Sequence, residues 1–552
     1  MTFFEQLQNK AMHLEFSSRR STVLGTRGMV AASQPLAAAA GIKILSQGGN
    51  AVDAAVATAA ALNVTEPTST GLGGDAFALY YQARTGSVFA LNGSGRASRH
   101  LTLELLKREG LNEELPATHA YTVTVPGACA AWCDILERFG RFDLKTVLAP
   151  AIQLAEEGFP VAPVTAHAWQ RAATRLLNKS WNGSELTIDG RGPRCGEIFR
   201  NPGLARTLKG IAEGGKDYYY QGPIAEAVAG AVQAAGGCLD QEDLAAHNST
   251  WEEPISTVYR GVRIWECPPN GQGLAALLAL NLLEGFDVAA LPPLSTRRLH
   301  LMIEALRLAF ADARRYIADP AFFPAPLHEL LSPDYAADRR NLIDPCRANP
   351  AVKHGMPIAA SDTVYFSVVD GEGNACSFVN SNYMGFGTGI VPYGWGFSLQ
   401  NRGHNFSLDP SSPNALAPGK RPYHTIIAAL ATDAKDNSLL ANFGVMGGFM
   451  QPQGHTLVAT ALWDDLCNPQ AALDRPRFCI EPDTSGSLVS LEEGIPVQVM
   501  ADLAAMGHHV QPVTGAARSL FGRGQIILRD PASGVLWGGS DPRADGVAYP
   551  VG

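Results

Sequence analysis

Thr363 stands at the first position of a predicted strand, 363–369, which runs into a tight turn at Gly371. A loose stretch rich in Pro, Ala and Gly precedes it. If backbone cleavage exposed this threonine as a new N-terminus, its hydroxyl would be a nucleophile and its own α-amine a base. Threonine is also common at the start of strands that have no catalytic role, so neighbouring residues must decide between the two interpretations.

Two features near Thr363 favour the catalytic interpretation. The predicted strand 375–381 pairs with the first strand and ends at Ser381, which it brings back toward Thr363. Gly447 and Gly448 follow a predicted strand and precede a predicted helix. Consecutive glycines at such a turn can point backbone N–H groups at one spot, as an oxyanion hole requires.

Three other motifs are weaker. The glycines of segment 71–74 could cradle a phosphate, but no strand precedes them and no Lys-Ser/Thr follows, so tight backbone packing is favoured. His300 and Glu304 share a helix face, but the motif has no second histidine, which favours an ordinary surface or core pair over a zinc site. The Gly-Ser-Gly at 93–95 is too short for a nucleophile elbow.

Composition narrows the class of protein. The chain has 552 residues, 46% hydrophobic, with a net charge of -9 and no basic run, which argues against nucleic acid and anionic membranes as partners. Its nine cysteines form no C-x-x-C pair, so reduced, mostly buried thiols are expected. The N-terminus lacks the apolar core of a signal peptide, and no apolar run is long enough to span a membrane. We expect a cytoplasmic protein that handles a small molecule, with no metal or cofactor.

The pattern of elements predicts an α+β layered core. An alanine-rich helix begins near Leu36, and Asn50 caps a second helix that continues through Asn63. Two strands, 76–82 and 87–91, follow, and the region 112–350 is predicted to be mainly helical, with 298–318 as its clearest helix. Beyond Ser361 the predicted strands are 363–369, 375–381, 425–432, 439–443 and 525–528, with one helix at 455–466.

Taken together, the motifs resemble those of γ-glutamyltranspeptidases, the self-cleaving branch of the N-terminal-nucleophile hydrolases. They are GGNAVDAA (48–55), GLGG (71–74), TVPG (124–127), LAPA (148–151), PNG (269–271), TVYFSVVD (363–370), FGTG (386–389), KRP (420–422), GG (447–448) and SDPR (540–543). The resemblance implies a four-layer αββα sandwich. It also implies cleavage between Asp362 and Thr363 into intertwined large (1–362) and small (363–552) subunits that together form one catalytic domain. A homodimer of this processed heterodimer stays open.

The resemblance also implies roles for the catalytic residues. Thr363 would attack its own preceding carbonyl and later the substrate amide, forming an acyl-enzyme. Ser381 would hold the nucleophile's hydroxyl, a role that a threonine plays in the family. Gly447 and Gly448 would donate N–H groups to the oxyanion.

The residues expected to grip glutamate differ from the family pattern. Arg96 is shifted by about two positions from the arginine that binds the substrate carboxylate. Arg402 and Asn405 stand where an acid or amide and an aspartate bind the amino group. The remaining candidate substrate-binding residues are Tyr383, in place of an asparagine, and His424 and Thr425, in place of two serines. The lid segment 407–420 is also shorter, which indicates a more open site.

A pocket changed in this way is more cationic and less suited to a free α-amino acid, since an ammonium group beside Arg402 would lose its ion pair. Arg96, Arg402 and His424 are candidate carboxylate holders, and arginine suits this role by bidentate hydrogen bonding. The sequence therefore predicts a self-processing threonine amidohydrolase acting on a small carboxylate-bearing amide, as in the family's oxamate amidohydrolases of purine catabolism. The alternatives are a γ-glutamyl hydrolase or transferase, an acylase of the cephalosporin type with a larger acyl group, and an uncleaved, inactive binding homologue.

Overall fold

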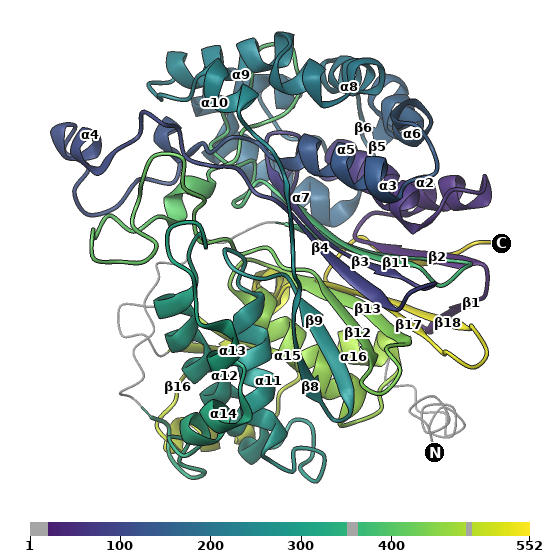
Figure 1. Cartoon of the computed structure of the whole chain (residues 1–552), viewed down its shortest axis with the longest axis vertical. Coiled ribbons are helices and arrows are strands. Elements are labelled where there is room, and N and C mark those ends of the chain that lie inside the picture. The colour runs from purple at the N-terminus through teal and green to yellow at the C-terminus, as the bar shows by residue number, and fades with distance from the viewer. Residues whose placement is uncertain (1–19, 350–362, 482–487) are drawn as a thin grey trace.

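Two antiparallel β-sheets lie face to face at the centre of the protein, and helices cover the outer face of each (Figure 1). The computed structural model describes residues 20–349, 363–481 and 488–552. The expected four-layer αββα sandwich is confirmed. Two hydrophobic faces on each sheet explain why their central strands are continuous apolar runs rather than alternating ones.

The first sheet contains seven strands within the described residues, and Thr363 lies at the open end of its central hairpin, just before the first strand of that hairpin. Its order is β19 (Val547–Pro550), β2 (Gly28–Ala32), β10 (Val364–Asp370), β11 (Ala375–Ser381), β3 (Asp75–Gln82), β4 (Ser87–Gly93) and β7 (Thr250–Glu252). Strands β10 and β11 are the predicted hairpin, and the observed register pairs Val364 with Asn380. That register places Thr363 beside Ser381.

The second sheet also has seven described strands. Its order is β1 (Val23–Gly25), β18 (Leu536–Ser540), β17 (Arg523–Arg529), β13 (Leu439–Met446), β12 (Ala429–Asp433), β9 (Val262–Glu266) and β8 (Ile255–Tyr259). The prediction of a mainly helical region at 112–350 missed the β8–β9 hairpin. Its turn is made by Arg260 and Gly261, both at positive φ, a geometry that matches the twist of paired strands.

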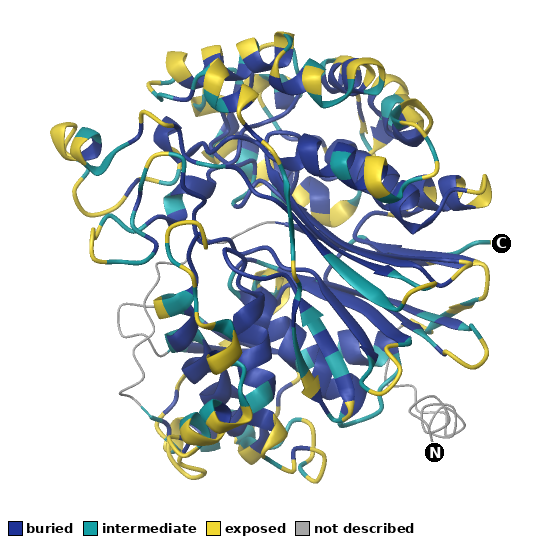
Figure 2. Cartoon of the chain, in the orientation of Figure 1, coloured by how far each residue is buried: buried dark blue, intermediate teal, exposed yellow. Residues whose placement is uncertain are grey.

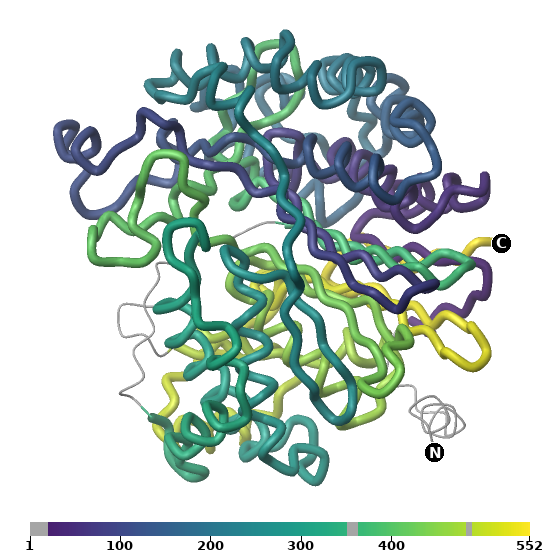
Figure 3. The backbone as a smooth tube through the Cα atoms, viewed as in Figure 1, coloured from purple at the N-terminus to yellow at the C-terminus, as the bar shows by residue number. Residues whose placement is uncertain are grey.

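Both sheets combine strands from before and after Thr363. In the first sheet β10 and β11 lie between β2 and β3, and in the second β12 pairs with β9. Figure 3 shows this interleaving as the mixing of early and late colours within each sheet. The two parts of the chain therefore share one core, as the expectation of intertwined subunits requires.

Helices form the two outer layers. Those over the first sheet are α2 (Pro35–Ser46), α3 (Ala51–Thr65), α5 (Ala128–Phe139), α6 (Leu144–Glu157), α7 (Pro163–Arg175), α8 (Pro202–Tyr220), α9 (Pro223–Ala234) and α10 (Gln241–Ala245), with α4 (Leu103–Arg108) at the side. Those over the second are α11 (Gly273–Glu284), α12 (Thr296–Tyr316), α13 (Leu327–Leu330), α14 (Pro333–Arg340), α15 (Met450–Trp463), α16 (Pro469–Asp474) and α17 (Val497–Ala505). The predicted cap at Asn50 is confirmed, and Asp53 completes a capping box.

Smaller elements complete the fold. A small sheet contains β14 (Phe478–Ile480), β15 (Leu488–Glu492) and β16 (His509–Val513), and a separate pair contains β5 (Phe159–Pro160) and β6 (Ile198–Phe199). The short 3₁₀ turns are Ala120–Thr122, Leu177–Lys179, Gly183–Leu186, Arg402–Asn405 and Gly515–Phe521. Two predicted starts were wrong by four or five residues. Helix α15 begins at Met450 rather than 455, since a helix tolerates Pro452 in its first turn, and strand β12 begins at Ala429 rather than 425.

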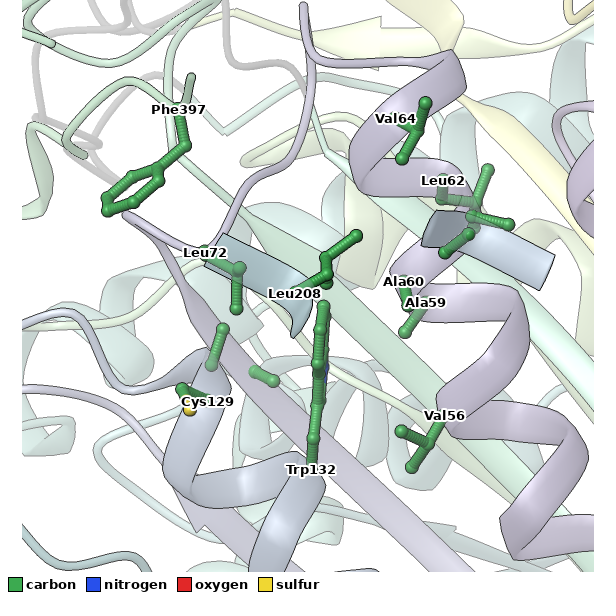
Figure 4. Close-up of a cluster of buried hydrophobic side chains, with 14 of the residues drawn as sticks. Val56, Ala59, Ala60, Leu62, Val64, Leu72, Cys129, Trp132, Leu208 and Phe397 are labelled. Carbon is green, nitrogen blue, oxygen red and sulfur yellow. The ribbon is translucent and has the colours of Figure 1, made fainter. Parts of the chain in front are cut away.

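Separate hydrophobic clusters fill the three spaces between layers, and the central strands are buried on both faces (Figure 2). The outer cluster on the first sheet packs α3 against its neighbours; Figure 4 shows Trp132, Leu208 and Phe397 in this cluster. Helix α3 is buried along its whole length, and its alanines allow the close approach of neighbouring backbones. No helix among the described residues is long and apolar enough to cross a membrane.

Candidate active site

Thr363 is buried immediately before β10, and its Oγ1 lies 3.0 Å from Oγ of Ser381. Ser381 is the last residue of β11, so the hairpin register alone brings the two hydroxyls together. The spacing is that of an O–H···O hydrogen bond, in which either oxygen can donate. Asp362, the predicted cleavage partner, lies outside the described residues.

Ser381 is the centre of a small hydrogen-bond network. Its Oγ accepts a hydrogen bond from the backbone N–H of Tyr383 at 2.9 Å and one from Nη2 of Arg402 at 3.3 Å. Tyr383 has a φ of 76°, a left-handed conformation that is strained for a residue with a side chain. This turn directs the Tyr383 amide toward Ser381, the nucleophile's partner.

The glycine segment 71–74 packs directly behind Ser381. A Cβ on Gly74 would lie 2.2 Å from the Ser381 carbonyl oxygen, and one on Gly73 would lie 2.1 Å from that of Ser398. Neither position has room for a side chain. The glycines therefore support the close-packing interpretation of this motif over the phosphate-binding one.

Arg402 is fully buried beside the nucleophile. Its Nη1 donates to Oγ1 of Thr425 at 2.7 Å, and its guanidinium lies 4.4 Å from the centre of the Tyr383 ring. Burial lowers the pKa of Arg402 to about 10, opposed by the charge of Asp75, so the guanidinium is still charged at neutral pH. Its Nε has no hydrogen-bond partner within the described residues.

Tyr383 packs against this guanidinium, and Asn405 in turn hydrogen-bonds to Tyr383. Burial raises the pKa of Tyr383 to about 12, against the opposing effects of the Arg402 charge and a hydrogen bond with Asn405. The Asn405 amide also donates to the Tyr423 carbonyl at 3.1 Å. Three of the predicted site residues, Thr363, Tyr383 and Arg402, thus contact Ser381 directly. Two more join the network through these, Thr425 through Arg402 and Asn405 through Tyr383.

His424 is also buried here, but its ring is already engaged. Nδ1 accepts a hydrogen bond from the Ile426 amide at 3.3 Å, which leaves Nε2 to donate to Oδ2 of Asp75 at 2.9 Å. Burial and the charge of Arg402 lower the pKa of His424 to about 3. The neutral imidazole therefore holds Asp75, which differs from the expectation that it helps to bind a carboxylate.

Asp75 begins strand β3 and is itself fully buried. Its Oδ1 accepts hydrogen bonds from the amides of Gly95 and Gly127 and from Nε2 of Gln400, all between 2.9 and 3.1 Å. Burial opposes the charge, but the hydrogen bond from His424 and the charge of Arg402 outweigh it and lower the pKa of Asp75. Asp75 is thus an ionised carboxylate that balances Arg402 without contacting it directly.

Gly447 and Gly448 form the turn between β13 and α15, with φ values of 130° and 61°. Their carbonyls accept hydrogen bonds from the first turn of the helix, whereas neither amide donates one within the described residues. Nε2 of Gln272 donates to the carbonyls of both Thr425 and Gly448. This bridge ties the glycine turn to the residue that Arg402 contacts.

Arg96 is not part of this network. Its side chain is partly exposed and makes no hydrogen bond or ion pair within the described residues; its charge acts on Arg421 and His247 instead. Reasoning from the sequence also missed Asp75, Gln272 and Gln400. An acidic residue at the start of a largely apolar strand was the available signal for Asp75, and nothing in the sequence distinguished the two glutamines.

Known proteins resemble the chain over nearly its whole length. The family profile described as Gamma-glutamyltranspeptidase matches residues 37–551. A glutathione hydrolase-like YwrD proenzyme of Bacillus subtilis is 36% identical over 96% of this chain and 99% of its own, and an oxamate amidohydrolase proenzyme of Klebsiella pneumoniae is 34% identical over 96% and 99%. The crystal structure of a cephalosporin acylase from Bacillus halodurans superposes with a TM-score of 0.89 and 46% identity, covering 97% of this chain and 98% of that one.

Proposed function

This chain belongs to the γ-glutamyltranspeptidase family, and from that membership we propose that it is a self-processing threonine amidohydrolase. Its substrate is a small amide that carries a carboxylate, of the oxamate type. The reaction passes through an acyl-enzyme on Thr363. The proposal rests on Arg402, a buried cation one hydrogen bond away from the partner of the nucleophile.

Processing comes first. The Thr363 hydroxyl adds to the carbonyl carbon of Asp362, the peptide C–N bond breaks, and the proton passes to the new α-amine. Water then hydrolyses the ester and releases a chain of residues 1–362 with a free carboxylate. The remaining chain, 363–552, now begins with threonine, whose α-amine has a reference pKa of about 7.7–8.0. That value suits a general base near neutral pH.

Amide hydrolysis repeats the same attack on the substrate. The α-amine takes the hydroxyl proton as Oγ1 bonds to the amide carbon, and then gives it to the departing amine. Ser381 orients Oγ1, and the amides of Gly447 and Gly448 receive the oxyanion, where one such donor is worth about 10²–10³ in rate. Water cleaves the acyl-enzyme; with oxamate the products are oxalate and ammonia.

The preference for a carboxylate follows from the charges around the nucleophile. Both carboxylate oxygens of Asp75 already accept hydrogen bonds, from two backbone amides, Gln400 and His424. Among the described residues, Arg402 forms no ion pair with an acidic side chain. A substrate carboxylate can pair with the guanidinium, including its unpartnered Nε. A substrate ammonium in the same place would face repulsion and a cost of several kcal/mol.

The test is a substrate comparison with the processed enzyme. Oxamate, a glutaryl amide, glutamine, glutathione and a γ-glutamyl anilide are compared by ammonia or amine release at equal concentration. We expect oxamate or the glutaryl amide to be hydrolysed with the highest kcat/KM. Which of the two is the better substrate indicates the length of acyl group that the site prefers. Rapid anilide release, saturating as with glutathione, would instead assign a γ-glutamyl hydrolase or transferase.

An inactive binding homologue is excluded or supported by a denaturing gel. The uncleaved chain has a mass of 58.6 kDa, and processing predicts two shorter bands whose small subunit begins at Thr363. Edman sequencing or mass spectrometry of that subunit gives its first residue. A single full-length band that is the same in wild type and Thr363→Ala would support the binding homologue.

A further inference from the structure

Three buried side chains of the outer helical layer, His300, Glu304 and His508, form a cluster on elements that carry none of the residues placed at Thr363. His300 and Glu304 lie on one face of α12, and His508 comes just before β16. One nitrogen or oxygen from each lies within 4.8 Å of the others. The sequence motif lacked a second histidine, but the fold supplies one from about two hundred residues further along the chain.

His300 already has the tautomer and direction of a metal ligand. Nε2 of His300 lies 2.7 Å from the Asp344 carbonyl, which can only accept, so this nitrogen carries the proton. Nδ1 of His300 therefore presents its lone pair toward Nε2 of His508, 2.7 Å away. A backbone carbonyl that fixes the far nitrogen of an imidazole is the usual outer-shell partner of a metal-binding histidine.

Glu304 is held beside the two rings. Its Oε1 accepts from Nη1 of Arg307 at 2.7 Å and its Oε2 from the Asn349 amide at 3.0 Å. A carboxylate offers about four lone-pair sites, so each oxygen keeps one for a cation. His300 and Glu304 stand at i and i+4, on the same face of the helix, so a Glu304 carboxylate oxygen can reach the metal without a change in the helix.

We propose that His300, Glu304 and His508 form a zinc site, with Nδ1, a carboxylate oxygen and Nε2 as ligands and water in the fourth position. Two imidazoles and a carboxylate are a donor set that Zn²⁺ takes in tetrahedral geometry. At Zn–N distances of about 2.0–2.1 Å the two nitrogens would stand about 3.3 Å apart, so the rings need to separate slightly. Without zinc, Nε2 of His508 carries the proton that it donates to Nδ1 of His300, and zinc takes the place of this proton. Nδ1 of His508 has no hydrogen-bond partner in the described residues, so it can carry the proton instead, and the ring is held from one side only and can move.

The site would have a structural role. It would link α12 to the segment before β16 and, through Asp344 and Asn349, to the chain that follows α14. The neighbouring hydrogen bond from the Ala348 amide to the Met506 carbonyl joins the same two segments. The inference does not depend on the proposed hydrolysis, since no ligand of the zinc touches the active-site network.

The experiment uses the full-length, processed protein, stripped of metal with a chelator and dialysed. Equilibrium dialysis with Zn²⁺ and metal analysis should give one ion per chain, and Co²⁺ in its place should give the intense visible bands of a four-coordinate site. Loss of an outer-shell partner costs about 10–100-fold in metal affinity, so His508→Gln should weaken binding by at least about 100-fold. The matched control His328→Gln, on the exposed face of α13, should bind as wild type.

Zinc uptake that is absent in the wild type, or equal in wild type and His508→Gln, would overturn the proposal and leave a hydrogen-bonded pair of histidines. If His508→Gln does not fold, Glu304→Gln and the wild-type Co²⁺ spectrum decide in its place, an octahedral spectrum counting against the site. Amide hydrolysis by the stripped protein is measured in parallel. Activity in a protein that binds no zinc would count against the zinc site alone. Zinc binding in a protein without activity would count against the proposed hydrolysis alone.

Discussion

The nucleophile Thr363 and the buried cation Arg402 both contact Ser381, but they are held in place by different kinds of interaction. Backbone geometry places Thr363, since the β10–β11 register sets its distance to Ser381, and glycines 73 and 74 fix the neighbouring chain. Charged and polar side chains place Arg402, which depends on Thr425, Ser381 and the counter-charge of Asp75. A few substitutions can therefore change the charged and polar groups beside Ser381 while the nucleophile stays in place.

This difference explains how relatives named as a glutathione hydrolase-like protein, an oxamate amidohydrolase and a cephalosporin acylase can all share one fold. The backbone-positioned part suits any amide. Under the proposed function, the part positioned by side chains would select which acyl group reaches the nucleophile, and in this chain that part is a buried arginine.

The largest effect is expected from Thr363→Ala, which removes the nucleophile. In hydroxyl-nucleophile hydrolases this loss costs on the order of 10⁶ in kcat, and here it should also abolish processing. A denaturing gel and an ammonia-release assay measure both. Thr363→Ser keeps a hydroxyl at Oγ and should still be processed, so a cleaved alanine variant would show that another group attacks Asp362.

Arg402→Gln should have the next largest effect, because it removes the proposed carboxylate partner. A hydrogen bond to a charged group is worth about 1.5–3 kcal/mol, so kcat/KM for oxamate should fall by about 10- to 150-fold. The measurement is the ratio of oxamate to oxamide hydrolysis, since oxamide replaces the carboxylate with a neutral amide.

The ratio separates recognition from positioning. If Arg402 binds the carboxylate, the preference for oxamate disappears in the variant while oxamide hydrolysis changes little. If Arg402 only orients Ser381, the hydrolysis of both substrates slows by the same factor and the ratio is unchanged. Arg402 would then be a residue that positions the nucleophile, not one that recognises the carboxylate.

Gly74→Ala tests the backbone-positioned part. The added Cβ would meet the Ser381 carbonyl at 2.2 Å, so β11 or the glycine segment must shift. Relief of this contact to about 3 Å needs a shift of close to 1 Å, and misplacement by about 1 Å can cost about 10² in rate, so processing and hydrolysis should slow by up to about 100-fold. Gly230→Ala on α9, where a Cβ meets nothing within 4 Å, is the matched control and should behave as wild type in the same gel time course.

The same contrast decides what could be predicted from the sequence. Strand pairing and cap geometry depend on local residues, so the hairpin that carries Thr363 and the Asn50 cap were predicted correctly. The β8–β9 hairpin was missed because Arg260, a residue that rarely adopts positive φ, occupies its turn. The contact between Asp75 and His424 joins residues more than three hundred positions apart. No local pattern indicates that His424 donates to an aspartate rather than to a substrate.

Arg96→Gln is expected to have the smallest effect. The Arg96 side chain is partly exposed and makes no hydrogen bond or ion pair within the described residues, so its charge reaches the pocket only through solvent-screened distances. The KM for oxamate should change by less than about threefold, and by less still at high salt, because added ions weaken a long-range effect but not a direct contact. A tenfold rise in KM that persists at high salt would mean that Arg96 binds the substrate itself. The carboxylate would then be held by two arginines, one from each part of the precursor, and substrate binding would depend on how the two parts are joined.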